Sequence, residues 1–421
     1  MELQAAYASD HISQPVPQED LDAAFARGER LVPFRAEPRD GELVVIAVSE
    51  GETGIEPGDR IVRIGDVRAA DHVARLRTLV PAETERSRDA SHLARAFRSL
   101  SWAAGITLPT TVEVIRRDGS THSVEVAGVG ANARKDERLL ADGAMQPLAD
   151  SLVREVLVDS PPFRCVLLAL PSDKSPAAPN APIAYIDFPT MNTDLTAQWS
   201  GFLDEAITAV NARGCAGIIV DIRRNGGGDS QLGDMLLARL TDRAHRSASL
   251  LIWRRSAESD AMFACGVKPM WRWLIPIALP FFLPKYTELE YGQNWTYEIE
   301  PAAEPMVEPS FRGPTALLIG LGTYSSAMLL ADAVRTYDLM HTVGQPTGGV
   351  PNALGEIGFT QLPNSRFVVY HCGKEFRRAS GDASDLGPVV PHLVVEPVPG
   401  RDAALERAIE EIGRMHAERK R

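Results

Sequence analysis

Hydrophobic positions are spaced differently in the first third of the chain and in the remainder. Residues 42–48 are apolar apart from Glu42, residues 121–126 end in an alternation of polar and apolar side chains, and 54–66 gives a Gly-rich turn followed by an apolar run. Residues 111–126 contain Asp-Gly between two alternating runs, which predicts a β-hairpin. The first third is therefore predicted to be rich in β-strands.

From residue 182 onwards, short apolar runs alternate with helical periodicity. Residues 183–188, 217–222 and 315–320 are predicted strands, and each precedes a segment with apolar positions at helical spacing. Residues 195–213 form one such helix, which Gly214 ends. The chain closes with an amphipathic helix over 403–415. This alternation predicts an α/β core with a parallel sheet.

Composition limits the class of protein. With 421 residues the chain is too long for one ordinary core. Its net charge of −12 argues against a nucleic-acid partner, which needs a basic face. The four cysteines lie far apart without ligand spacing, so neither a metal site nor a cofactor is expected. The first residues lack the basic and apolar regions typical of a secretory signal.

One apolar stretch, WRWLIPIALPFFLP at 271–284, needs a separate account. It is shorter than the ~20 residues that span a bilayer, and it contains three prolines. We expect a contact with a membrane surface or a hydrophobic flap; a buried loop is the alternative.

A glycine cluster follows the predicted strand at 217–222. The segment Asp221 to Asp229 reads DIRRNGGGD, and its three glycines allow backbone amides to approach a ligand and point together, as an oxyanion site requires. A phosphate loop is disfavoured because no Gly-Lys-Ser/Thr follows. A simple tight turn is the alternative.

Ser325 occupies the corresponding place after the strand at 315–320. A hydroxyl between a buried strand and a helix projects from a sharp elbow, and the Ser326 amide at the helix start can stabilise an oxyanion. The alternative is that Ser325 is an ordinary N-cap.

In combination these segments resemble a known family. VDIRRNGGGD, then TYSSAMLLADAV, then VGQPTGGVPN is similar to the carboxyl-terminal-processing (tail-specific) serine peptidases and the tricorn protease core. The resemblance spans about 182–397 and implies a ClpP/crotonase-like core that hydrolyses polypeptide substrates. It places the nucleophile at Ser325 and the oxyanion donors at Gly226 or Gly227 and Ser326.

The general base departs from the tail-specific pattern. Val350 stands where those enzymes have the lysine that activates the serine, and its side chain accepts no proton. The tricorn-like branch uses a histidine and a carboxylate instead, and the resemblance places these at His11 and Asp385. Lys374 is a second candidate base, and Asp382 and Glu356 compete with Asp385. His245, His341 and His416 are interpreted as surface or helix residues.

Residues 42–129 resemble a PDZ domain of the bacterial protease type, through GIEPGDRIVRIGD, with a charged helical insertion near 80–105. A GLGF-like carboxylate loop is not evident.

The predicted organisation has five parts. They are an N-terminal segment (1–40), the PDZ-like domain (41–130), a helical linker (131–181), the catalytic α/β core (182–400, with an apolar insertion near 262–285) and a C-terminal helix (401–421).

The resemblance also implies an extracytoplasmic setting.

Two other functions are also compatible with the sequence. One is an inactive peptide- or protein-binding homologue, which Val350 favours. The other is a crotonase-like acyl-CoA enzyme, which the PDZ-like segment and Ser325-Ser326 disfavour.

Overall fold

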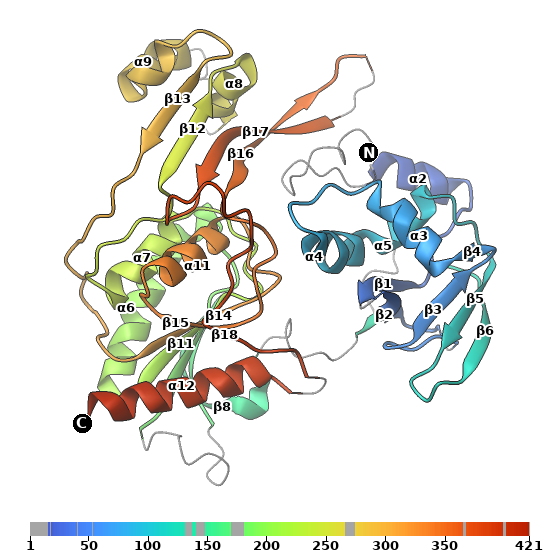
Figure 1. The fold of residues 1–421 in the computed structure, drawn as a ribbon, viewed down its shortest axis with the longest axis horizontal. Helices are drawn as coiled ribbons and strands as arrows, with labels where there is room; N and C mark the ends of the chain where they lie inside the picture. Colours follow the sequence, from blue (N-terminus) through green and yellow to red (C-terminus); the bar gives the residue numbers. More distant parts are fainter. Residues whose placement is uncertain are drawn as a thin grey trace. The chain divides into compact units, whose positions relative to one another are not determined.

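The computed structural model divides the chain into two compact units. The first comprises Met1–Ala141 with Phe359–His371, and the second Asp142–Gly358 with Cys372–Arg421 (Figure 1). The described residues are 16, 18–39, 41–52, 54–130, 137–139, 148–169, 181–265, 274–364, 368–398 and 401–420.

The first unit is built on an antiparallel sheet, as its alternating pattern predicts. Its strands run in the order β1-β2-β3-β5-β6, with β4 beside β3 and β7 beside β2. The strands are β1 (Phe34–Arg39), β2 (Glu42–Ser49), β3 (Arg60–Ile64), β4 (Val67–Arg68), β5 (Thr110–Ile115), β6 (Thr121–Val126) and β7 (Glu137–Leu139). The helices are α2 (Gln18–Ala26), α3 (Ala69–Arg77), α4 (Glu85–Ser87) and α5 (Ala94–Ala103), with a π-helix over Arg88–Leu93 between the last two. Helices α4 and α5 and the π-helix lie within residues 80–105, where the sequence predicts a helical insertion.

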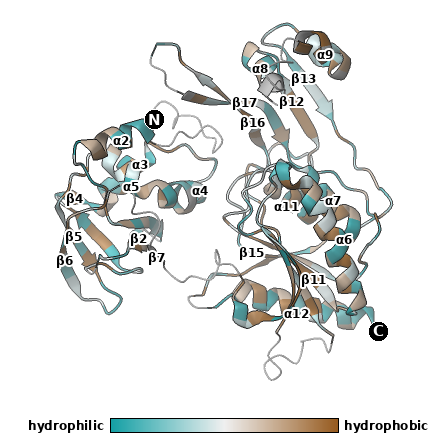
Figure 2. Cartoon of the chain, turned by 180° about the vertical axis from the view of Figure 1, so that it is seen from behind, coloured by the Kyte–Doolittle hydropathy of each residue, from teal (hydrophilic) through white to brown (hydrophobic). Residues whose placement is uncertain are grey.

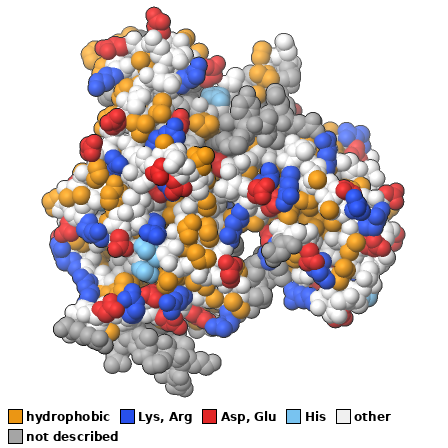
Figure 3. Space-filling model, viewed as in Figure 1, with side chains coloured by type: hydrophobic (Ala, Val, Ile, Leu, Met, Phe, Trp, Pro, Cys, Tyr) orange, Lys and Arg blue, Asp and Glu red, His pale blue; other side chains and the backbone are white. Residues whose placement is uncertain are grey.

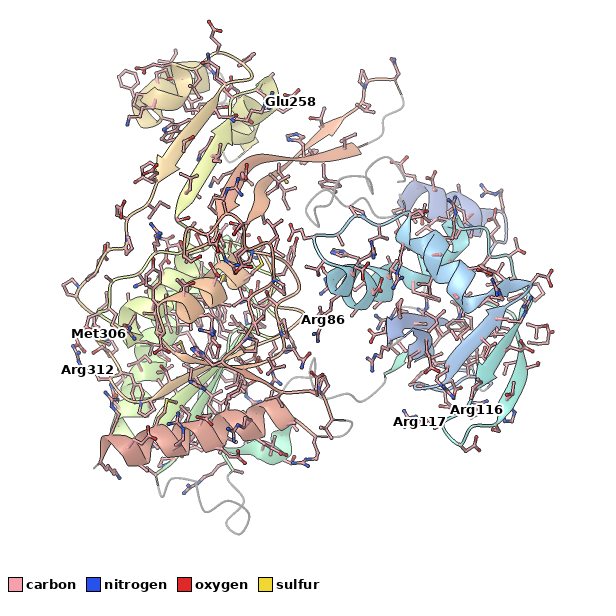
Figure 4. All side chains as sticks on the ribbon, in the orientation of Figure 1. Arg86, Arg116, Arg117, Glu258, Met306 and Arg312 are labelled. Atoms are coloured by element: carbon pink, nitrogen blue, oxygen red, sulfur yellow. The ribbon has the colours of Figure 1, made fainter. Side chains whose placement is uncertain are left out.

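A buried carboxylate holds the turn that the GIEPGD segment forms. Asp59 Oδ2 accepts hydrogen bonds from the Glu56 amide at 2.8 Å and from Arg116 at 2.7 Å. A second Arg116 nitrogen donates to the Gly54 carbonyl at 2.6 Å (Figure 4). The turn is therefore fixed by the β5–β6 hairpin, because Arg116 follows β5 directly.

The second unit has three layers. Its central sheet runs β18-β15-β14-β11-β10-β9-β8, with β10, β11, β14, β15 and β18 parallel. The strands are β8 (Val153–Ser160), β9 (Phe163–Leu168), β10 (Ile183–Asp187), β11 (Gly217–Asp221), β14 (Thr315–Ile319), β15 (His341–Gly344) and β18 (Leu393–Val394). The predicted parallel α/β core is confirmed in outline.

Two hydrophobic cores lie on opposite faces of this sheet. Ile218 and Val220 pack with α6 (Thr196–Ala212), α7 (Gln231–Leu240) and α11 (Ser326–Thr336). Ile219 packs on the other face with α12 (Ala403–Arg419). Figure 2 shows hydrophilic and hydrophobic residues alternating along α12, as expected for a helix with one buried face. Successive β11 side chains therefore pack into different hydrophobic cores, one on each face of the sheet.

The prediction of a helical linker over 131–181 is wrong for residues 153–168. These residues form β8 and β9, which pair with each other and extend the central sheet through β10. Val153–Ser160 alternates partly buried and exposed positions for most of its length, and this period of two fits a strand at the sheet edge. The second unit therefore begins before residue 182.

A separate four-stranded sheet is formed mainly by residues of the second unit. Its order is β13-β12-β17-β16, from β12 (Leu250–Arg254), β13 (Asn294–Glu298), β16 (Ala353–Gln361) and β17 (Val368–Arg377). Helices α8 (Ala257–Cys265), α9 (Ile275–Phe282) and α10 (Pro284–Thr287) lie between β12 and β13 in the chain. In α9, Ile277 is 59% and Phe281 82% exposed. The membrane-surface contact expected there stays a prediction.

Surface charge is mixed on the face that Figure 3 displays, where Lys and Arg side chains are interspersed with Asp and Glu. Among the described helices, none combines the length and the apolar character needed to cross a bilayer.

Candidate active site

The glycine cluster and Ser325 lie at the same edge of the central sheet. Strands β11 and β14 are parallel neighbours, with Asp221 opposite Leu318. The glycine loop leaves the carboxyl end of β11, and the turn to Ser325 leaves the carboxyl end of β14. Ligand sites of open parallel sheets lie at this edge.

Ser325 has an unusual backbone conformation. Its φ is 51° and its ψ −126°, a region that residues other than glycine rarely occupy. It precedes α11 directly, yet its side chain makes no capping hydrogen bond in the first turn, which the structure describes in full. The geometry is that of a strand-to-helix elbow, and an N-cap role does not explain it.

Gly227 packs directly against this elbow. A Cβ atom on Gly227 would lie 2.7 Å from Ser325 Cβ and 2.8 Å from the Ser326 nitrogen, and Gly227 has a φ of +93°. Two hydrogen bonds join the same segments. The Tyr324 amide donates to the Asn225 carbonyl at 3.0 Å, and Ser326 Oγ donates to the Gly228 carbonyl at 2.5 Å. Only glycine fits at 227.

The backbone amides around Ser325 differ in whether they already donate a hydrogen bond within the protein. The Gly227 amide donates to Asn225 Oδ1 at 2.9 Å, while Asn225 Nδ2 donates to the Phe188 carbonyl at 2.8 Å. The Ser326 amide stands at the first position of α11, where a helix offers no internal acceptor. Among the described residues, apart from its two chain neighbours, nothing lies within 4 Å of the place a Gly226 Cβ would occupy, so the space beside it is open.

A buried ion-pair network anchors the start of the glycine loop. Arg223 donates to both carboxylate oxygens of Asp221, and to Asp402, which caps α12. Tyr185 also donates to Asp221 at 2.7 Å. Burial alone would raise the pKa of Asp221, but the adjacent Arg223 guanidinium holds it below its usual value. The loop is therefore fixed at its first residues.

Asp385 lies in the loop after β17 and is half exposed. It forms an ion pair with Arg378, and its Oδ1 accepts from the Gly387 amide at 3.0 Å. Arg378 also contacts Asp332 of α11 at 3.2 Å, and both are buried. The helix that Ser325 precedes is thus connected to Asp385 through Asp332 and Arg378.

The rival carboxylates have other partners. Asp382 Oδ1 accepts from the amide and hydroxyl of Ser384, which holds the pKa of Asp382 below its usual value. Glu356 forms an ion pair with Lys374 at 2.6 Å.

The candidate general bases differ in where the structure places them. His11 lies outside the described residues. Lys374 Nζ stands between Glu356 and the faces of Trp253 and Phe376, at 4.1 and 4.9 Å from the ring centroids. These three contacts already engage the Lys374 ammonium group. Val350 is buried.

The sequence interpretation missed a pocket beside the elbow. It lies between α7 and α11 and is lined by Ser326, Asp234 and His245, among others. His245 was interpreted as a surface or helix residue because nothing in the sequence relates the loop after α7 to Ser325. Asp234 follows the glycine loop at helical spacing from Ser230, and this was the available signal.

Comparisons with known proteins bear on the family and the fold of the chain. The family model described as Peptidase family S41 matches residues 182–393, which is half of the chain. A search of curated proteins gave no significant match.

Among solved structures, mature CPAF is similar with a TM-score of 0.60 and 16% identity, covering 92% of this chain and 82% of that one. Its complex with lactacystin gives 0.57 and 16%, covering 93% and 83%. The photosystem II D1 C-terminal processing protease gives 0.42 and 17%, covering 96% and 82%. The two CPAF structures share the fold of this chain.

Proposed function

The chain belongs to peptidase family S41, and we propose that it is a serine endopeptidase that cleaves polypeptide substrates through an acyl-enzyme on Ser325. Hydrolysis of peptide bonds by a serine-type enzyme is the activity of the family as a whole. The assignment of Ser325, of its partners and of the mechanism is our inference.

The strained elbow at Ser325 carries this proposal. A residue other than glycine at φ 51° persists only where the surrounding structure imposes it, and such strain is concentrated at functional sites. Here the elbow packs against the backbone of Gly227, which leaves room for it because glycine has no side chain. The fold thereby keeps the Ser325 side chain from capping α11.

The chemistry follows from this placement. Ser325 Oγ attacks the carbonyl carbon of the scissile bond while a base accepts its proton, and the carbonyl oxygen becomes an oxyanion. The amides of Gly226 and Ser326 donate to that oxyanion; Gly227, already bonded to Asn225, supports them. The C–N bond then breaks, the amine takes the proton from the base, and water releases the acyl group from Ser325.

We assign the base to His11 and the orienting carboxylate to Asp385. The assignment rests on the tricorn-like resemblance and on Val350, because the tail-specific lysine is missing. Lys374 is disfavoured by its contacts with Glu356 and two aromatic rings. A neutral imidazole accepts the serine proton at neutral pH, and a carboxylate fixes its tautomer.

We further propose that the second unit is a ClpP/crotonase-like core and that the first is a PDZ-like domain. The three-layer arrangement around a largely parallel sheet supports the former. The antiparallel sheet with the Asp59-stabilised turn supports the latter.

Digestion of a denatured, carboxymethylated protein tests the proposal, with products identified by mass spectrometry. The wild type should produce discrete peptides, and Ser325→Ala and His11→Ala should produce none above background. Ser123→Ala, at an exposed position of β6, is the matched control and should retain cleavage. Cleavage by Ser325→Ala would reject the nucleophile. A wild type without any cleavage would favour an inactive binding protein.

A further inference from the structure

The pocket beside the elbow has a definite relation to the proposed reaction. It follows one face of α7, from Ser230 to Leu237, and one face of α11, from Ser326 to Ala333. The pocket therefore begins at the residue next to the nucleophile and continues between the two helices.

The position of Ser326 in the pocket wall indicates which part of a substrate enters the pocket. Its amide is one of the proposed donors to the oxyanion, so the carbonyl of the scissile bond lies beside it. The side chain closest to that carbonyl belongs to the residue on the acyl side of the bond, P1. A pocket with Ser326 in its wall is thus placed to receive the P1 side chain.

The polar groups of the pocket are mostly acceptors. Asp234 of α7 is exposed at its wall, and in the described part of the chain its carboxylate forms neither an ion pair nor a hydrogen bond. His245 Nδ1 donates to the Arg243 carbonyl at 2.8 Å, which leaves Nε2 with a lone pair in the neutral ring. The hydroxyls of Ser230 and Ser247 complete the polar lining.

The charge around Asp234 is also negative. Although Asp234 is exposed, the surrounding protein partly desolvates its carboxylate, which raises its pKa; His245 opposes this, and Asp229 and Glu304 add to it. Asp229 and Glu304 therefore add negative charge near Asp234, whose carboxylate has no cationic partner among the described residues. A ligand that brings a positive charge and several N–H donors would satisfy these groups together.

We propose that this pocket is the P1 specificity pocket and that Asp234 selects lysine or arginine there. The inference rests on the proposed role of Ser325 and adds the substrate class. The apolar walls, which include Leu237 and Leu330, pack along the aliphatic stem of such a side chain, while its charged end reaches Asp234.

An ordinary alternative exists for Asp234. An acidic residue in the first turn of a helix stabilises that helix through its dipole, by about 0.3–1 kcal/mol. That role predicts a small loss of thermal stability in Asp234→Asn and no change in substrate choice. Reversal of the charge separates the two roles.

Peptides that differ only at P1 test the proposal. With P1 as Arg, Lys, Met or Glu, the wild type should have a kcat/KM at least about tenfold higher for Arg and Lys than for Met. Asp234→Asn should remove this preference while leaving the Met peptide within about twofold, and Asp234→Lys should favour the Glu peptide. Glu205→Gln, an exposed carboxylate on α6, is the control and should behave as wild type. Unchanged P1 preference in both Asp234 variants, or an equal loss for all four peptides, would overturn it.

A binding measurement keeps this test independent of turnover. Fluorescence anisotropy of labelled Arg and Met peptides is compared between Ser325→Ala and Ser325→Ala/Asp234→Asn. Tighter binding of the Arg peptide that depends on Asp234 supports the pocket even if the wild type cleaves nothing, in which case only the proposed function fails. Equal binding of the two peptides by Ser325→Ala rejects the pocket.

Discussion

Gly227 and Ser325 are in such close contact that a side chain at position 227 would displace Ser325. The Cα of Gly227 faces Ser325 Cβ, and a methyl group there would lie 2.7 Å from it. This contact joins the loop after β11 to the elbow after β14. It is the structural basis for treating both segments as one site.

Replacement of Gly227 by alanine should therefore disable the site. The new methyl group meets Ser325, and alanine disfavours a φ of +93°, so the elbow has to shift. We expect a loss of about 10²-fold or more in kcat, as for disruption of an oxyanion site. Gly226→Ala is the comparison, since in the described part of the chain no atom beyond its neighbours in sequence lies within 4 Å of its Cβ position. Equal activities of the two variants would contradict the packing argument.

The carboxylate of Asp385 should matter for catalysis more than for stability. If it fixes the tautomer of the base, Asp385→Asn lowers kcat by about 10⁴-fold while the fold persists. Asp382→Asn serves as the control, because Asp382 caps its own turn through Ser384. Circular dichroism checks the fold of each variant. Full activity of Asp385→Asn would assign the orienting role elsewhere.

Arg378 should be a stability residue through its contact with Asp332. Arg378→Met leaves the buried Asp332 carboxylate with the Ala379 amide as its remaining described partner, and we expect a loss of about 3–5 kcal/mol in the free energy of unfolding. Burial already raises the pKa of Asp332. A raised pKa in the folded state lowers stability as pH increases, so the variant should lose more at pH 8 than at pH 5.

Urea denaturation at the two pH values measures this loss. The double variant Asp332→Asn/Arg378→Met should recover part of the stability, because the uncompensated charge is gone. An unaltered midpoint in Arg378→Met would show that the pair contributes little.

His72 should make the first unit sensitive to acid. Its ring is buried against Ser101, with 3.0 Å between Nε2 and Oγ, and burial lowers its pKa to about 4. In the unfolded chain it protonates near 6.5, so protons favour unfolding. The stabilisation is complete above about pH 6.5 and declines as pH falls toward 4, by about 3 kcal/mol in all.

Hydrogen exchange over residues 41–126 at pH 7 and pH 4.5 measures this effect. His72→Gln keeps a polar group for Ser101 but does not titrate, so its protection should change less between the two pH values. The idea fails if wild type and variant respond equally.

Local sequence signals predicted the elements around Ser325 well. Buried strands such as Gly217–Asp221 and Thr315–Ile319 are continuous apolar runs, and the glycines and serines that end them have conformational preferences of their own. The register that places Asp221 opposite Leu318 follows once both strands join one parallel sheet. Motif spacing therefore indicated which loops meet.

Other features depend on contacts between distant segments. Strand β12 pairs with β17, with Leu250 opposite Arg377, and no local pattern specifies that partner. Residues 153–168 were interpreted as helical because single-sequence periodicity is ambiguous at a sheet edge. His245 joins the site through a bridge to Ala302 and the hydrogen bond to Arg243. Tertiary structure alone brings these residues together.

The reactivity of Ser325 is the central claim, and labelling by a fluorophosphonate probe tests it most directly. The wild type and Ser123→Ala should form one covalent adduct each, located at residue 325 by peptide mapping, and Ser325→Ala should form none. An adduct of undiminished yield on folded Ser325→Ala, or a folded wild type that the probe never modifies, would contradict the account.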